Sequence, residues 1–187
     1  MRERIGLRLR EKRHESEKVF EGNLINVRLD TVILPNGEKA RRETVEHPGA
    51  AAVVPVSKEG NIILVRQYRN PIDEIILEIP AGKLEPGEDP QDCAMRELQE
   101  ETGYKSDSLK HLATFYTTPG FSNEILYLYA ALDLKRASKN LDPEEFIEVV
   151  GLPLSELRDM VQRKEIVDAK TLIGIMMLGG IVGDQRW

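Results

Sequence analysis

The residues from 89 to 103 constrain the fold most, because they predict one helix with both ends marked. Asp89 can cap the N-terminus, Pro90 suits the first helical position, and Gly103 fits the residue just past the C-terminus. At 3.6 residues per turn, the helix predicted over residues 90–102 has about three and a half turns. The chain on either side of it has the patterns of strands, so this helix must pack on a sheet.

The predicted helix carries Glu97, Glu100 and Glu101 at positions i, i+3 and i+4. This spacing places the carboxylates on one face. Negative charge in the last turn opposes the helix dipole by roughly 0.3–1 kcal/mol per exposed group. Two such charges about 6 Å apart repel by ~3 kcal/mol at an effective dielectric of about 20. We therefore expect a positive group between the carboxylates.

The chemistry of the carboxylate ligands indicates which cation that would be. Carboxylate oxygens favour a hard cation, Mg²⁺ or Mn²⁺, over zinc. Mg²⁺ held by a few carboxylates normally keeps open positions for substrate phosphates. On the residues alone, the alternative is a solvated acidic face, which is common on helices.

Hydrophobic periodicity predicts strands before and after the helix. Near the N-terminus, Pro35-Asn36-Gly37 supplies a turn between two strands, which predicts a hairpin. A second strand pair, separated by a turn at residues 58–61, is rich in Val and Ile. Strands on both sides of a central helix, followed by helices, predict an α+β fold with a mixed sheet. The predicted strands are 27–34, 41–46, 50–56, 62–68, 112–117, 125–132 and 146–150, and the last helices start near Ser155 and Asp168.

Composition excludes several classes of protein. The 32 acidic residues outnumber the 26 basic ones, which argues against a nucleic-acid coat. The single cysteine, Cys93, excludes an intramolecular disulfide framework and indicates a reducing cytoplasm. The basic N-terminus lacks the apolar core of a secretory signal, and the apolar run Leu172 to Val182 is too short to span a bilayer. We expect a soluble cytoplasmic protein that binds neither nucleic acid nor membranes.

The residues around the helix have a further fixed spacing. Gly82 is followed after five residues by Glu88, and after seven more by Arg96-Glu97-Leu98, Glu100-Glu101 and Gly103. This pattern resembles the box of the Nudix hydrolase family up to its last position, where Tyr104 replaces the usual aliphatic residue.

The resemblance implies an α/β/α sandwich that cleaves a pyrophosphate with metal-activated water. Glu97 and Glu101 would be the principal metal ligands, Glu100 would share the metals, and the Ala81 carbonyl would complete a site. Arg96 would orient the glutamates and Glu88 would fix the loop. The implied cofactor is Mg²⁺, with Mn²⁺ as a possible substitute.

Outside the box, the chain resembles the ADP-ribose pyrophosphatase subfamily. The stretches concerned are Phe20-Glu-Gly, residues 42–50, Arg66-Gln-Tyr-Arg69, Ile79 to Lys83, Thr117 to Glu124 and Asp168 to Thr171. By this resemblance, Arg42 and Arg69 would contact the substrate phosphates, for which guanidinium geometry is suited, and Glu124 would contact the substrate. A catalytic base is implied on the loop of residues 141–145, with Glu145 the first choice and Glu144 the second.

The predicted function is Mg²⁺-dependent hydrolysis of ADP-ribose to AMP and ribose 5-phosphate. Two alternatives stay open: a pyrophosphatase for another nucleoside diphosphate sugar, such as GDP-mannose, or for a dinucleotide, and a Nudix-fold sensor that binds nucleotide without turnover. The resemblance also implies a homodimer, with residues 1–45 as an N-terminal strand subdomain that packs on the partner. Residues 46–187 would form the hydrolase domain.

Overall fold

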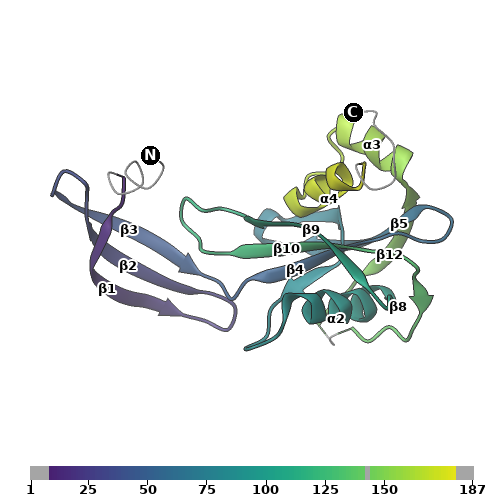
Figure 1. The fold of residues 1–187 in the computed structure, drawn as a ribbon, viewed down its shortest axis with the longest axis horizontal. Helices are drawn as coiled ribbons and strands as arrows, with labels where there is room; N and C mark the ends of the chain where they lie inside the picture. The colour runs from purple at the N-terminus through teal and green to yellow at the C-terminus, as the bar shows by residue number, and fades with distance from the viewer. Residues whose placement is uncertain (1–8, 142–143, 180–187) are drawn as a thin grey trace. The chain divides into compact units, whose positions relative to one another are not determined.

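The computed structural model describes residues 9–141 and 144–179 (Figure 1). The chain divides into two compact units, Met1–Gly49 with Tyr116–Ile125, and Ala50–Phe115 with Leu126–Trp187. Asp142 and Pro143 of the predicted base loop, and residues 180–182 of the apolar run, lie outside the described residues. In the part that is described, no helix is long and apolar enough to cross a membrane.

The first unit contains a three-stranded antiparallel sheet in the order β1-β2-β3. Its strands are β1 (Lys12–Glu21), β2 (Asn26–Ile33) and β3 (Lys39–Glu46). The predicted hairpin is β2 and β3, and Gly37 in its turn has a φ of 87°, which a side chain would strain. Every residue of β1 is exposed, so this strand has no apolar pattern by which the sequence could have revealed it.

The second unit holds the remaining sheets. A four-stranded sheet has the order β7-β4-β10-β9, a three-stranded sheet has the order β12-β5-β6, and β11 pairs with β8. Because β4 runs parallel to β10 and antiparallel to β7, the first of these sheets is mixed, as predicted. The strands are β4 (Ala50–Pro55), β5 (Asn61–Arg69), β6 (Glu74–Glu78), β7 (Ala81–Lys83), β8 (Tyr104–Lys105), β9 (Leu109–Tyr116), β10 (Ile125–Ala131), β11 (Lys135–Arg136) and β12 (Glu148–Pro153), with a short 3-10 helix at Asn70–Ile72.

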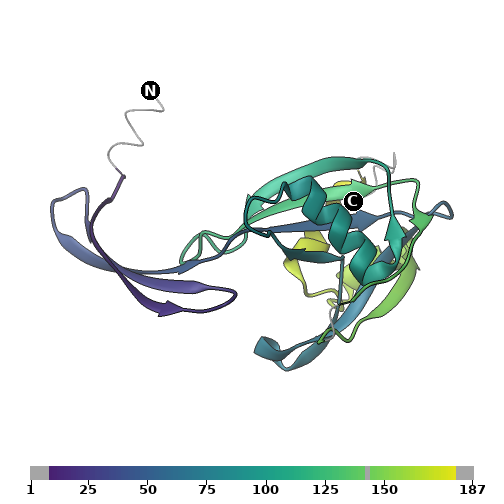
Figure 2. The same ribbon diagram turned by 90° about the horizontal axis from the view of Figure 1, so that it is seen from below.

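Strand β4 shows why the second unit has three layers. All six of its residues are buried, so both faces of the strand need a covering layer. Ala52 and Val54 pack in one core cluster with α3 and α4, whereas Ala51 and Val53 pack in another with α2. The helices are α2 (Pro90–Thr102), α3 (Leu154–Gln162) and α4 (Ala169–Gly179). Figure 1 shows α2 on one side of these strands and α3 and α4 on the other, and Figure 2 shows α2 crossing them. This is the predicted α/β/α sandwich in an α+β fold.

Helix α2 has the predicted bounds and the predicted ends. The Asp89 side chain accepts a hydrogen bond from the Gln91 N–H at 2.8 Å, and Pro90 is the first helical residue. Gly103 adopts a left-handed conformation with φ 70°, and its N–H donates to the Gln99 carbonyl. The sequence therefore fixes the register of the helix that carries the glutamates.

One pairing differs from the sequence pattern. The segments of β4 and β5 were expected to pair with each other, but they lie in different sheets and share only a bridge between Val56 and Ile62. The apolar run of β4 is buried on both faces, which suits a central strand between two neighbours better than one arm of a hairpin.

Candidate active site

The three glutamates of α2 differ in how deeply they are buried. Glu97 and Glu101, four residues apart, retain only 9% and 3% of their accessible surface. The Glu100 side chain is 34% exposed. Glu97 and Glu101 therefore face the strands beneath α2, while Glu100 lies at the edge of the cluster.

Gly82 makes room for the Glu97 carboxylate. A Cβ placed on Gly82 would overlap the Glu97 carboxyl group directly. The neighbouring Ala81 pairs with Ala52 of β4 and donates its N–H to Glu101 Oε2 at 3.2 Å. The backbone of β7 thus lies against both buried carboxylates, and no side chain intervenes at residue 82.

Arg96 connects the cluster to the loop that precedes α2. Its guanidinium donates to Glu97 at 2.6 Å and to Glu100 at 3.0 Å. It also makes two hydrogen bonds to Glu88, at 2.9 and 3.1 Å. Glu88 in turn accepts from the Glu85 N–H at 2.9 Å, which holds the loop. One arginine therefore orients two of the glutamates and anchors the loop between β7 and α2.

Burial and mutual repulsion raise the pKa of both inner carboxyls. For Glu97, burial raises the pKa most, and the charges of Glu100 and Glu145 add to this, against Arg96. For Glu101, burial, Glu97 and Glu145 raise the pKa to about 8, although Arg69 and the Ala81 N–H oppose the shift. In the absence of a cation the ionised forms of both carboxyls are therefore disfavoured, mainly by burial and further by the neighbouring carboxylates.

These residues fit a bound cation. Glu101 accepts its hydrogen bond from Ala81, and within residues 9–141 and 144–179 no Lys, Arg or His side chain forms an ion pair with it. A buried carboxylate of this kind gains from a metal ion, and oxygen ligands suit a hard one. Over the same residues, no three His, Cys, Asp or Glu side chains already converge as a metal cage. In this structure, Glu97 and Glu100 are held by their hydrogen bonds to Arg96.

Comparison with known proteins assigns the family. The NUDIX domain model matches residues 46–172, and the model of the nucleoside diphosphate sugar hydrolase N-terminal domain matches residues 11–45. The chain belongs to the Nudix family. Proteins of this family are metal-dependent hydrolases. In this chain, the pattern from Gly82 to Gly103 is the Nudix box.

Two curated relatives cover nearly the whole chain. The ADP-ribose pyrophosphatase of Bacillus subtilis is 45% identical over 91% of this chain and 93% of its own length. The methanol dehydrogenase activator of Bacillus methanolicus is 44% identical over 93% and 95%. A crystal structure of an ADP compounds hydrolase superposes with a TM-score of 0.83 over 95% of this chain and 97% of that one, at 23% identity. That last match shows the fold.

Beside the Nudix box, Arg69 is held by a buried carboxylate. Arg69 donates to Glu78 from Nε at 2.8 Å, and Lys170 donates to the same carboxylate at 2.8 Å. Lys170 also contacts Asp168, whose other oxygen accepts from the Thr171 N–H at the start of α4. This network joins β5, β6 and α4, and the Arg69 charge partly opposes the rise in the pKa of Glu101. Arg69 therefore lies close enough to the Nudix glutamates to act on them.

Arg42 and Glu124 belong to the first unit. Arg42 on β3 is half exposed and pairs with Glu11. Glu124 accepts a hydrogen bond from Thr117 Oγ1 at 2.5 Å and lies 3.6 Å from His47 Nδ1. That distance is too long for a hydrogen bond, and His47 Nδ1 already accepts from the Gly49 N–H at 3.1 Å. Both predicted substrate contacts are therefore solvent-accessible charged groups.

The structure brings together most of the predicted residues of the second unit. Ala81 contacts Glu101, Glu100 shares Arg96 with Glu97, and Glu145 acts electrostatically on both buried glutamates. Glu144 and Glu145 are both exposed, and within the described part of the chain no hydrogen bond or ion pair connects either of them to the cluster. Glu78 and Lys170 were not predicted. A glutamate within the apolar stretch from Ile75 to Ile79 is a signal that could have singled out Glu78.

Proposed function

We propose that this protein hydrolyses the pyrophosphate bond of ADP-ribose to give AMP and ribose 5-phosphate, with Mg²⁺ as its metal. The observation that carries the proposal is the match to an ADP-ribose pyrophosphatase at 45% identity over 91% of this chain. The intact Nudix box with its buried glutamates supplies the chemistry that such a reaction needs.

Each residue has a part in this proposal that follows from its position. Glu97, Glu101 and the Ala81 carbonyl would hold Mg²⁺, and Glu100 would share it. When bound, the metal would neutralise phosphate charge and lower the pKa of a water molecule. The raised pKa values of Glu97 and Glu101 support this assignment, because burial disfavours their charged forms and a bound cation would favour them.

The arginines and Glu124 would bind the substrate. Arg69 keeps one edge on Glu78 while its side chain remains 40% exposed, so the free part of its fork can bind phosphate oxygens. Arg42 is similarly exposed, at 45%. Glu124 would accept hydrogen bonds from substrate hydroxyls. Arg42→Gln and Arg69→Gln should each raise KM for ADP-ribose more than they lower kcat.

We assign the catalytic base to Glu145 rather than Glu144. The Glu145 charge raises the pKa of both buried glutamates, which supports a position near the metal ligands, whereas no such effect involves Glu144. Glu145→Gln should lower kcat strongly, and Glu144→Gln is the matched control on the adjacent residue. Equal losses in the two variants would contradict this choice.

A substrate panel tests the proposed reaction. The purified chain should convert ADP-ribose to AMP in the presence of Mg²⁺, lose this activity with a chelator, and regain it with Mg²⁺ or Mn²⁺. A higher kcat/KM for GDP-mannose or a dinucleotide would favour the alternative pyrophosphatases. Tight binding without turnover would favour a nucleotide sensor, against which the intact Glu97, Glu100 and Glu101 already count.

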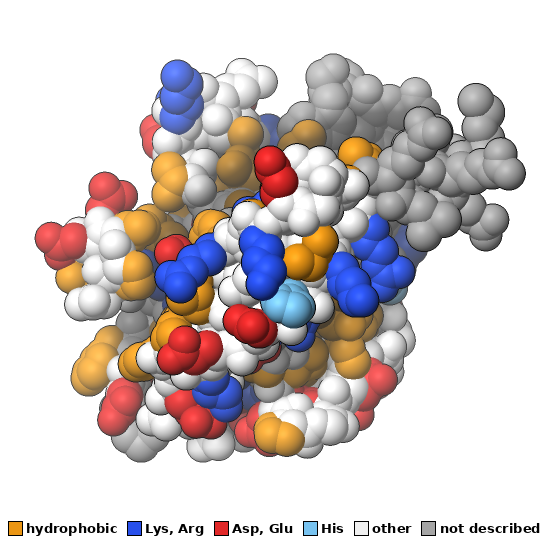
Figure 3. Space-filling model, turned by 90° about the vertical axis from the view of Figure 1, so that its left-hand side faces the viewer, with side chains coloured by type: hydrophobic (Ala, Val, Ile, Leu, Met, Phe, Trp, Pro, Cys, Tyr) orange, Lys and Arg blue, Asp and Glu red, His pale blue; other side chains and the backbone are white. Residues whose placement is uncertain are grey.

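We further propose a homodimer formed through the N-terminal strands of residues 1–45. Four apolar side chains of this region are more than half exposed: Leu9 at 74%, Val19 at 53%, Phe20 at 53% and Leu24 at 54%. In Figure 3, hydrophobic side chains lie scattered among charged ones on the face shown. Sedimentation should give twice the chain mass, and the pair of changes Val19→Ser and Phe20→Ser should lower it. A monomeric wild-type chain would refute the proposal. The cytoplasmic location remains a prediction.

A further inference from the structure

The second unit contains a cavity of about 510 Å³ at the C-terminal end of α2. Its walls come from the turn between β4 and β5, from β8 and β12, and from the segment that begins with β11. None of its lining residues belongs to the glutamate cluster or to the proposed substrate contacts. Its volume lies in the range of roughly 300–1,000 Å³ that is usual for small-molecule sites.

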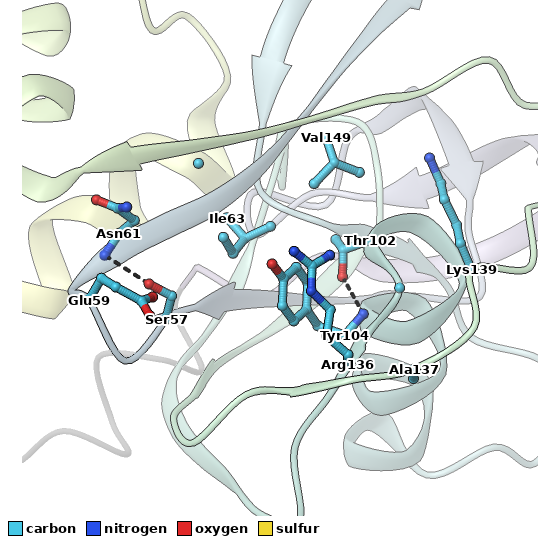
Figure 4. Close-up of a pocket in the computed structure, with 12 residues that line it drawn as sticks. Ser57, Glu59, Asn61, Ile63, Thr102, Tyr104, Arg136, Ala137, Lys139 and Val149 are labelled. Atoms are coloured by element: carbon cyan, nitrogen blue, oxygen red, sulfur yellow. Dashed lines mark hydrogen bonds between the residues drawn. The ribbon is translucent and has the colours of Figure 1, made fainter.

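One wall of the cavity is positively charged. The Arg136 guanidinium lies over the Tyr104 ring, with its central carbon 4.4 Å from the ring centroid. Figure 4 shows this stacked pair in the middle of the cavity and Lys139 at one end. No described residue accepts a hydrogen bond from the Arg136 guanidinium. Stacking limits its orientation, so its donors are already arranged for an anion.

The other parts of the cavity have different chemistry. Glu59, Ser57 and Asn61 lie at the end opposite Lys139 (Figure 4). A carboxylate there repels a second anionic group but accepts hydrogen bonds from hydroxyls. Ile63 and Val149 form an apolar side that suits the carbon face of a sugar. The cavity therefore has one place for a phosphate and, beyond it, a place for hydroxyls.

We propose that this cavity is a second ligand site, which binds a sugar phosphate monoester outside the glutamate cluster. The phosphate would bind the stacked Arg136 and the ammonium of Lys139. Lys139 donates to the Ile147 carbonyl at 3.1 Å and has further protons available. The sugar hydroxyls would bind Glu59 and Asn61. This site uses none of the residues of the proposed hydrolysis, so the two proposals can fail separately.

Isothermal titration of the full chain tests the site with ribose 5-phosphate, inorganic phosphate and ribose as probes. A chelator and the change Glu101→Gln remove binding through the proposed metal centre. We expect ribose 5-phosphate to bind more tightly than phosphate, and ribose to show no measurable binding. Arg136→Gln should weaken ribose 5-phosphate at least ten-fold, and Lys139→Gln should weaken it to a smaller extent.

Two controls make the result specific. Arg163→Gln removes one positive charge from an exposed arginine at the end of α3 and should leave binding unchanged. Glu59→Gln should weaken ribose 5-phosphate but not inorganic phosphate. The proposal is overturned if Arg136→Gln binds ribose 5-phosphate as the wild type does, if binding disappears with Glu101→Gln, or if no binding is detected at millimolar ligand.

Discussion

The exposed Arg69 guanidinium is anchored by Glu78, a carboxylate that retains only 2% of its accessible surface. Both Nε and a terminal nitrogen of Arg69 lie 2.8 Å from the same oxygen, Glu78 Oε2. Lys170 supplies a second cation, 2.8 Å from the other oxygen. Since a buried charge is stable only when it is paired, this carboxylate cannot move without disturbing both cations.

We predict that Glu78 positions Arg69 for substrate binding. Glu78→Gln keeps the size of the side chain but removes its charge, so KM for ADP-ribose should rise while kcat changes less. Glu78→Ala removes the carboxylate that pairs with Lys170 and Arg69. Because Lys170 is largely buried, this change should lower the free energy of unfolding by about 3–5 kcal/mol.

Glu148→Gln is the matched control for this prediction. Glu148 pairs with Arg66 at 2.8 Å, but that pair is largely exposed, and its loss should cost at most ~1 kcal/mol. Steady-state kinetics and denaturant unfolding distinguish the two sites. If Glu78→Gln behaves as Glu148→Gln does in both measurements, Glu78 does not position Arg69.

A second prediction concerns the glycine that opens the Nudix box. A Cβ at residue 82 would overlap the Glu97 carboxyl group, so Gly82→Ala should displace this carboxylate and lower kcat by at least ten-fold. Gly151→Ala on β12 is the control, because its Cβ would meet only Ile63 at 3.5 Å, an ordinary contact. Gly151→Ala should keep its activity. Full activity in Gly82→Ala would mean that Glu97 need not lie against β7.

The sequence predicts the elements whose own residues carry a local signal. Helix α2 was predicted residue by residue, because Asp89, Pro90 and Gly103 each act within one turn of the helix end. The buried strands β4 and β5 were located by their Val and Ile content. Strand β1 was missed, because its ten residues are all exposed and mostly charged. It is held by pairing with β2, which a one-dimensional pattern does not record.

The candidate site shows the same limit. The spacing of Glu97, Glu100 and Glu101 places them on one helix, but their unequal burial depends on strands far away in sequence. Glu78 and Lys170 are 92 residues apart, and only the packing of α4 beside β6 brings them into contact. Which strands pair, and which charged residues meet, therefore required the structure.

A third prediction is that Glu101 is needed for catalysis but not for the stability of the fold. Because the pKa of Glu101 is raised from 4.5 to about 8 in the folded state, folding between these pH values must protonate this carboxyl, which Glu101→Gln avoids. The thermal midpoint of Glu101→Gln in the absence of metal should therefore equal that of the wild type below pH 4.5 and exceed it increasingly toward pH 8. Its kcat should fall by orders of magnitude if Glu101 binds the metal. Asp92→Asn, in the first turn of the same helix, should keep kcat and lose a few tenths of a kcal/mol, because it weakens a favourable dipole interaction. A modest fall in kcat for Glu101→Gln would mean that Glu101 is not a principal metal ligand.

The fourth prediction follows from the two hydrogen bonds between Arg96 and Glu88. These bonds lower the pKa of Glu88 from 4.5 to about 2, although burial opposes the shift. Because the folded-state pKa is the lower one, the pair stabilises the fold fully above about pH 4.5, and its contribution is lost as the pH falls toward 2. The unfolding free energy of the wild type should exceed that of Glu88→Gln by about 1–3 kcal/mol at pH 6. The difference should shrink steadily between pH 4.5 and pH 2.5 in urea unfolding, and in an Arg96→Gln background it should be small at every pH. A difference that stays constant over this range would show that Arg96 does not stabilise the charged form of Glu88.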